Sequence, residues 1–142
     1  MYRKILVALE NSSADENLLA QVTELAKRLG SELLLLHVAD GWAARNFERL
    51  SLAESEEIKT DRAYLERVAD KIRAEKLTVA ALLALGNPPQ EILKAAEANN
   101  CDMIAMGSHG HRLIGDILHG STIHEVRHKT SLPVLLIRAD KK

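Results

Sequence analysis

Short runs of almost wholly apolar residues punctuate this chain, and the stretches between them repeat apolar residues every three or four positions. The apolar runs are residues 5–9, 33–38, 78–85, 101–106 and 133–137. Runs of this length without polar alternation are typical of strands buried on both faces of a parallel sheet. The period of the intervening stretches predicts helices. We expect one domain spanning residues 1–142.

Helices are expected in the four intervals between these strands. The first begins at a capping box made by Ser13 and Glu16 and ends at Gly30, which suits a left-handed cap. A second helix follows the polar, irregular stretch 40–56. The apolar face of that second helix consists of Leu65, Val68, Ala69 and Ile72.

The last two helices are expected over residues 90–99 and 121–129. Proline stands in the first turn of the earlier one, where a missing N–H costs nothing. In the later one Ser121 and Thr122 are good N-cap residues, and Thr122 and Glu125 have the spacing of a second capping box.

Strands that alternate with helices predict an α/β fold, a doubly wound five-stranded parallel sheet with helices on both faces. Residues 33–38 are leucine-rich and compatible with a helix, but their short length directly after Gly30 favours a strand. Right-handed crossovers leave few strand orders, of which we expect 3-2-1-4-5. In such sheets a ligand binds where the strand order reverses, here between the strands that end at Leu9 and Met106.

One glycine-bearing stretch predicts a phosphate site in the same place. Gly107-Ser108-His109-Gly110 is followed, after nine residues, by Gly120-Ser121-Thr122. A strand, a glycine loop and a helix N-terminus in this order let the backbone approach a ligand and aim unpaired N–H groups at an anion. The spacing is neither the dinucleotide nor the P-loop signature. The alternative is that these glycines only close a strand-to-helix loop.

The pattern Gly107-x-x-Gly110, nine residues, Gly120-Ser121 resembles the nucleotide loop of the universal stress protein family. Four further segments are similar to that family, so the resemblance covers nearly the whole chain: residues 4–8, 36–38, 86–88 and 132–138. It implies a cytoplasmic, ATP-binding, often dimeric stress-response protein with the 3-2-1-4-5 sheet.

The resemblance also implies a set of nucleotide-binding residues. The ends of the first two strands would hold adenine, and the glycine loop would hold ribose and phosphates. The expected site comprises Ala8, Leu9, Glu10, Ser12, Val38, Met106, Gly107, His109, Gly110, Gly120, Ser121 and Thr122. The expected ligand is ATP, or else AMP or ADP, with magnesium or manganese, and Glu10 could contact that nucleotide-bound cation.

Two positions depart from the family pattern. The family usually has Val-Asp-Gly-Ser where this chain has Leu9-Glu10-Asn11-Ser12, so the acidic side chain is one methylene longer. Leucine is common where this chain has His119, which would place a titratable group beside the phosphates.

Composition narrows the function classes. The net charge of −1 gives no broad basic surface, so we expect no nucleic-acid partner. No apolar run approaches the roughly 20 residues of a membrane span, which predicts no membrane insertion. The single cysteine, Cys101, excludes an internal disulfide and fits a reducing compartment, so we expect a cytoplasmic protein with an inert core thiol.

A histidine string offers a competing interpretation. Residues 124–128 read His-Glu-Val-Arg-His, which satisfies the bare zinc-hydrolase motif. A zinc hydrolase needs this helix in an open cleft with a third ligand, whereas Ile123 and Val126 here are available for packing. His128 near the helix C-terminus is explained by the helix dipole. We expect no protein-only metal site.

Three function classes follow. The leading one is an ATP-binding regulatory module. The second is a slow ATP hydrolase or adenylyl-transfer enzyme, although no Walker lysine or arginine finger is evident near the loop. The residues that could act as a base there are Glu10, Asp40, Asp116 and His119. The third is a nucleotide-free dimeric interaction protein.

The fifth strand predicts how the chain assembles. In the expected order this strand lies at the sheet edge, and it is apolar at Val134, Leu135, Leu136 and Ile137. An exposed apolar edge invites pairing, so we expect a homodimer through this strand. Trp42 and Phe47 could cover the crevice mouth or pack on a partner.

Overall fold

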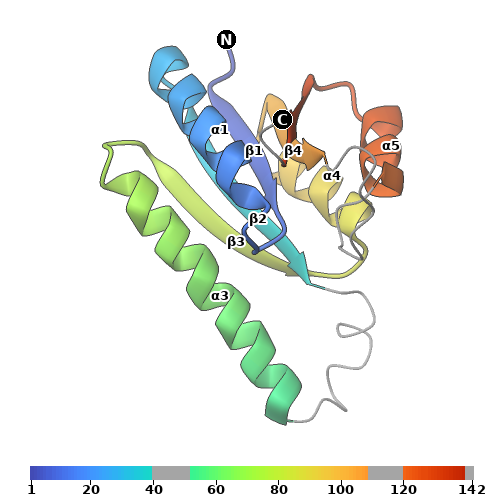
Figure 1. Cartoon of the computed structure of the whole chain (residues 1–142). Helices are drawn as coiled ribbons and strands as arrows, with labels where there is room; N and C mark the ends of the chain where they lie inside the picture. The colour runs from blue at the N-terminus through green and yellow to red at the C-terminus, as the bar shows by residue number, and fades with distance from the viewer. Residues whose placement is uncertain (40–51, 109–119, 140–142) are drawn as a thin grey trace.

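The computed structural model describes residues 1–39, 52–108 and 120–139 (Figure 1). Five strands form one all-parallel sheet in the order β3-β2-β1-β4-β5, which confirms the predicted fold class. The strands are β1 Lys4–Leu9, β2 Glu32–Ala39, β3 Val79–Leu85, β4 Met103–Ser108 and β5 Val134–Arg138. The helices are α1 Asp15–Leu29, α3 Leu52–Arg73, α4 Pro88–Ala98 and α5 Gly120–Lys129.

The sheet separates two hydrophobic clusters, one beneath each helical layer. Ile5, Val7 and Leu9 of β1 join the cluster under α1 and α3, whereas Leu6 and Ala8 join the one under α4 and α5. Every one of these side chains is at most 2% exposed. Because both faces of β1 are covered, its sequence reads as a continuous apolar run.

Both predicted capping boxes are wrong. Helix α1 begins at Asp15, and its N-cap, Ala14, makes no side-chain capping bond. The N–H of Glu16, which a Ser13 cap would engage, donates instead to the main-chain carbonyl of Ser13 at 3.2 Å. Helix α5 begins at Gly120, so Thr122 lies inside its first turn rather than at the cap. Gly30, by contrast, ends α1 with φ +69°, as predicted.

Helix α3 begins at Leu52, inside the stretch predicted to be irregular. The start of α3 projects beyond the sheet (Figure 1). The sequence at this start, residues 53–57, is mostly polar, so it carries no apolar period that would predict a helix. In the described part of the chain, no helix is long and apolar enough to cross a membrane.

Candidate functional site

The candidate site lies at the carboxyl ends of β1 and β4, where the strand order reverses. Ala8 of β1 pairs with Met106 of β4, and Gly107 follows directly. On the other side of β1, Leu9 pairs with His37 of β2. The structure therefore brings the first residue of the glycine stretch next to the loop after β1.

Several predicted site residues have buried side chains that belong to the core. Ala8, Val38 and Met106 pack in the cluster under α4 and α5, and Leu9 packs in the opposite cluster. Their exposures are 4% or less. What these strand ends can offer a ligand is therefore main-chain N–H and C=O groups rather than side chains.

Nothing in the described surroundings of Gly107 requires a glycine at this position. Its φ is not in the left-handed region, and an added Cβ would meet only the carbonyl oxygen of Ile137, at 3.9 Å, among described atoms. That distance is an ordinary van der Waals contact. Among the described atoms, neither backbone strain nor crowding explains this glycine, whereas close approach of a ligand to the backbone would.

The loop after β1 is organised around the carboxylate of Asp15. One carboxylate oxygen accepts the N–H of Glu10 at 2.8 Å, and the other accepts those of Asn11 at 2.8 Å and Ser12 at 3.3 Å. Asp15 is 1% exposed. Burial raises its pKa, while the N–H groups of Glu10, Ser12 and Asn11 act in the opposite sense. A carboxylate so buried is tolerable because these donors satisfy it.

Side chains from β2 and α3 hold the same loop from the other side. His37, 4% exposed, places Nδ1 2.9 Å from the carbonyl oxygen of Leu9, and its Nε2 lies 3.7 Å from the carboxylate of Asp61. Asn11 donates its side-chain N–H to the carbonyl of Asp61 at 3.0 Å. Tyr64 donates its hydroxyl to the carbonyl of Ser12 at 3.3 Å.

Known proteins resemble this chain in sequence. The sequence profile of the universal stress protein family matches residues 1–138. The chain belongs to the universal stress protein family. It is 28% identical to the universal stress protein MJ0577 of Methanocaldococcus jannaschii, over 97% of this chain and 96% of that protein. It is 32% identical to a universal stress protein of Thermus aquaticus, over 97% of this chain and all of that protein.

Solved structures share the fold. The structure of MJ0577 matches with a TM-score of 0.84 and 27% identity, covering 100% of this chain and 99% of that one. A universal stress protein of Archaeoglobus fulgidus, solved in complex with dAMP, matches with a TM-score of 0.70. At 24% identity, over 96% of this chain and 98% of that one, this second likeness shows a common fold.

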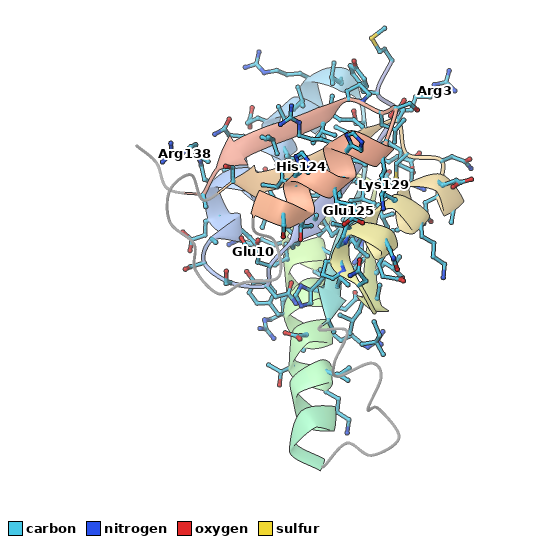
Figure 2. All side chains as sticks on the ribbon, turned by 90° about the vertical axis from the view of Figure 1, so that its right-hand side faces the viewer. Arg3, Glu10, His124, Glu125, Lys129 and Arg138 are labelled. Carbon is cyan, nitrogen blue, oxygen red and sulfur yellow. The ribbon has the colours of Figure 1, made fainter. Side chains whose placement is uncertain are left out.

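The departure from the family's usual Val-Asp-Gly-Ser has a structural explanation at its third position. Asn11 has φ +60°, the left-handed conformation that glycine adopts freely and that asparagine tolerates better than most residues. Asparagine can therefore replace the family's glycine without changing the turn. Glu10 follows β1 directly and is half-buried (Figure 2).

The second half of the predicted nucleotide loop is described only in part. His109 and Gly110 lie outside the described residues, as do Trp42, Phe47, Asp40, Asp116 and His119. Gly120, Ser121 and Thr122 form the first turn of α5, where Ser121 is exposed and Thr122 is buried. That turn contains no acidic residue, in contrast to Asp15 and Glu16 in α1 and Glu91 in α4.

The histidine string on α5 does not form a metal site within the described residues. The rings of His124 and His128 stack with centroids 6.0 Å apart, and Glu125 accepts a hydrogen bond from Lys129 at 3.1 Å. All of these lie on one short helix (Figure 2). Among the described residues, no three histidine, cysteine or acidic side chains are close enough to share a metal ion.

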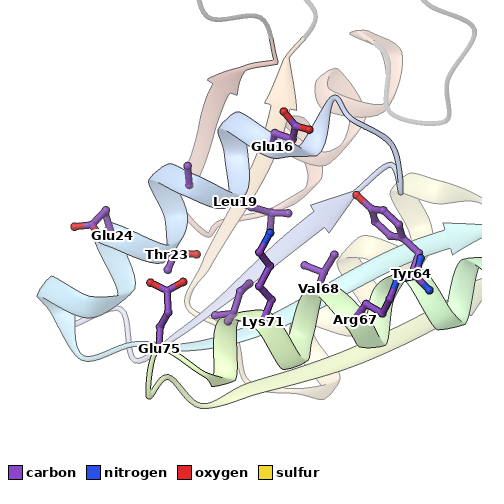
Figure 3. Close-up of a pocket in the computed structure, with 11 residues that line it drawn as sticks. Glu16, Leu19, Thr23, Glu24, Tyr64, Arg67, Val68, Lys71 and Glu75 are labelled. Atoms are coloured by element: carbon purple, nitrogen blue, oxygen red, sulfur yellow. The ribbon is translucent and has the colours of Figure 1, made fainter.

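A groove of about 820 Å³ lies between α1 and α3, on the face of the sheet that these two helices cover rather than at the strand ends (Figure 3). Leu19, Val68 and Ile72 contribute its apolar lining, and Arg67 and Lys71 stand among its charged residues. Tyr64 lines the groove and also bonds the loop after β1. Nothing in the structure indicates an occupant for this groove.

Sequence reasoning missed Asp15, His37, Asp61 and Tyr64 as residues of this region. His37 carried a signal, because a histidine inside an apolar strand needs a polar partner. Asp15 resembled an ordinary acid in the first turn of a helix. Asp61 and Tyr64 come from α3, and their proximity to the loop arises only in the folded chain.

Proposed function

We propose that this protein is a cytoplasmic, ATP-binding regulatory module of the stress response, with the nucleotide in the crevice between β1 and β4. The observation that carries the proposal is the pairing of Ala8 with Met106. This register sets Gly107 and the loop of Glu10 together where the strand order reverses. Family membership and the dAMP complex of the Archaeoglobus fulgidus protein support it.

The residues present fit a nucleotide. The first turn of α5 carries no acid that would repel phosphates, so the positive end of its helix dipole favours an anion. Gly107 leaves the backbone open to close approach. The loop Gly107-x-x-Gly110-x9-Gly120-Ser121 would hold phosphates and ribose, and Glu10 would contact a magnesium or manganese ion carried by the nucleotide.

The described residues favour a protein that binds ATP without hydrolysing it rapidly. A hydrolase needs a base that can orient and activate water. Both carboxylate oxygens of Asp15 are already occupied by main-chain donors, so Asp15 is a poor candidate. Glu10 is the remaining described acid at the end of β1, and we propose at most a weak ATPase.

Assembly through β5 completes the proposal. β5 is an edge strand of the sheet, and Leu136 on it is 39% exposed. Pairing of β5 with its symmetry mate in a second copy would cover residues 134–137 and remove the open edge.

The nucleotide carried by the purified protein tests this function. The protein is purified without added nucleotide and denatured, and the released small molecules are separated by chromatography. We expect ATP, because tight binding with slow turnover preserves it. Release of ADP or AMP alone would favour the hydrolase. A protein that releases no nucleotide and gives no signal when titrated with Mg-ATP, ADP or AMP would contradict the proposal and favour the nucleotide-free interaction protein.

A further inference from the structure

We propose that Asp15 is a positioning residue for the nucleotide site: its carboxylate fixes the main chain of residues 10–12 and thereby the placement of Glu10. This inference rests on the proposed function, because the loop matters to a nucleotide only if the crevice binds one. Asp15 itself lies behind the loop and would not touch the ligand.

Asp15 is directed at the loop rather than at its own helix. It is the first residue of α1, yet its oxygens accept N–H groups of residues 10–12, which precede the helix. The helix receives no side-chain cap at Ala14. Three donors converging on a carboxylate that is 1% exposed make the position of the loop depend on that one side chain.

Hydrogen bonds also connect the loop to α3, and they further restrict the conformation of the loop. Tyr64 binds the carbonyl of Ser12, and the carbonyl of Asp61 receives the side chain of Asn11. A loop between a strand and a helix is ordinarily among the more mobile parts of a protein. Here it is bonded from both helices, so the loop is ordered before ligand arrives and binding does not have to supply that ordering.

The chain contains a matched control at the other end of the same strand. Asp102 accepts the N–H groups of Arg3 at 2.9 Å and Lys4 at 3.1 Å, where β1 begins. Asp15 and Asp102 therefore both accept hydrogen bonds from main-chain N–H groups. They differ in burial, since Asp15 is buried and Asp102 is half-buried, and only Asp15 faces the end of β1 where the crevice lies.

The test compares full-length Asp15→Asn with Asp102→Asn and the parent protein. Asparagine keeps the size of the side chain but has one acceptor oxygen, so the N–H groups of residues 10–12 cannot all be satisfied. We expect Asp15→Asn to weaken Mg-ATP binding about tenfold, as loss of a hydrogen bond to a charged group would. Amide hydrogen exchange of residues 10–12 in the nucleotide-free protein should rise. Asp102→Asn should change neither measurement.

Two further variants separate positioning from general stability. In a Glu10→Ala background, Asp15→Asn should weaken Mg-ATP binding less than it does in the parent. The reason is that Asp15 acts through the placement of Glu10, which that background has already removed. Tyr64→Phe removes the hydroxyl bonded to Ser12 and should weaken Mg-ATP binding by roughly two- to tenfold, as loss of a neutral hydrogen bond would.

The outcomes distinguish this inference from the proposed function. Equal Mg-ATP affinity of Asp15→Asn and the parent, or unchanged exchange of residues 10–12, would overturn the role of Asp15 alone. If Asp15→Asn does not fold, Tyr64→Phe decides, and unchanged affinity and exchange in that variant overturn the inference. A parent protein that binds none of Mg-ATP, ADP and AMP would overturn both proposals.

Discussion

Asp15 and Asp102 accept main-chain N–H groups at opposite ends of β1, but they differ in burial and in pKa. Burial dominates at Asp15 and raises its pKa. At Asp102 desolvation acts in the same upward sense, but the N–H groups of Arg3 and Lys4 outweigh it and hold the pKa of Asp102 below its usual value of 3.8. The more exposed carboxylate therefore keeps its charge to lower pH.

The lowered pKa of Asp102 predicts a specific acid response. A depressed pKa stabilises the folded state above the unfolded-state value near 3.8, and this contribution is lost as pH falls through the lower folded-state value. We expect the parent to melt at a higher temperature than Asp102→Asn at pH 6, and this difference to shrink below about pH 4. Thermal melts from pH 6 to pH 2.5 measure it. A difference that stays constant over that range would refute the assignment.

At the level of elements, the strands were predictable because burial on both faces leaves an unbroken apolar signal. Helix starts were harder to predict, although the end of α1 at Gly30 was predicted correctly. Ser13 and Glu16 have the spacing of a capping box, yet the N-cap of α1 is Ala14, one residue later, and the N–H of Glu16 donates to the main-chain carbonyl of Ser13. The start of α3 was missed because the sequence of residues 53–57 is mostly polar and shows no apolar repeat of helical period.

Of the candidate site, the meeting of the strand ends was predicted from the sequence, and the role of the glycines stays a prediction. Spacing along the chain identified Gly107 and Gly120, and strand order brought Ala8 beside Met106. The polar contacts behind the loop could not be found this way. Those from α3 join residues about 50 positions apart, as in the bond from Asn11 to Asp61, and no local pattern records such a distance. Those from Asp15 are local, but its position in the sequence looks like that of an ordinary acid at a helix start.

At the scale of the whole molecule, the two edge strands make the proposed dimer testable. Leu136 on β5 is 39% exposed, and Leu82 on the opposite edge strand, β3, is 37% exposed. Light scattering at micromolar concentration should give a dimeric mass for the parent and for Leu82→Lys. Leu136→Lys should be monomeric, because a charge at the edge opposes strand pairing. A monomeric parent, or a dimer unaffected by Leu136→Lys, would contradict the β5 interface.

Gly120 offers the most direct test of the nucleotide site. It is the first residue of α5, whose helical backbone does not itself require glycine. A valine there should leave the fold intact but occupy the space where main chain and phosphate meet. Gly30 is the control: its φ of +69° makes Gly30→Ala strained, by about 1 kcal/mol, at the far end of α1 from the β1 loop.

Calorimetric titration of Mg-ATP into Gly120→Val, Gly30→Ala and the parent, with thermal melts of the nucleotide-free proteins, makes the comparison. We expect Gly120→Val to melt near the parent temperature and to show no binding. Gly30→Ala should melt at a lower temperature and bind Mg-ATP like the parent. Parent-like affinity in folded Gly120→Val would contradict a nucleotide site at the start of α5.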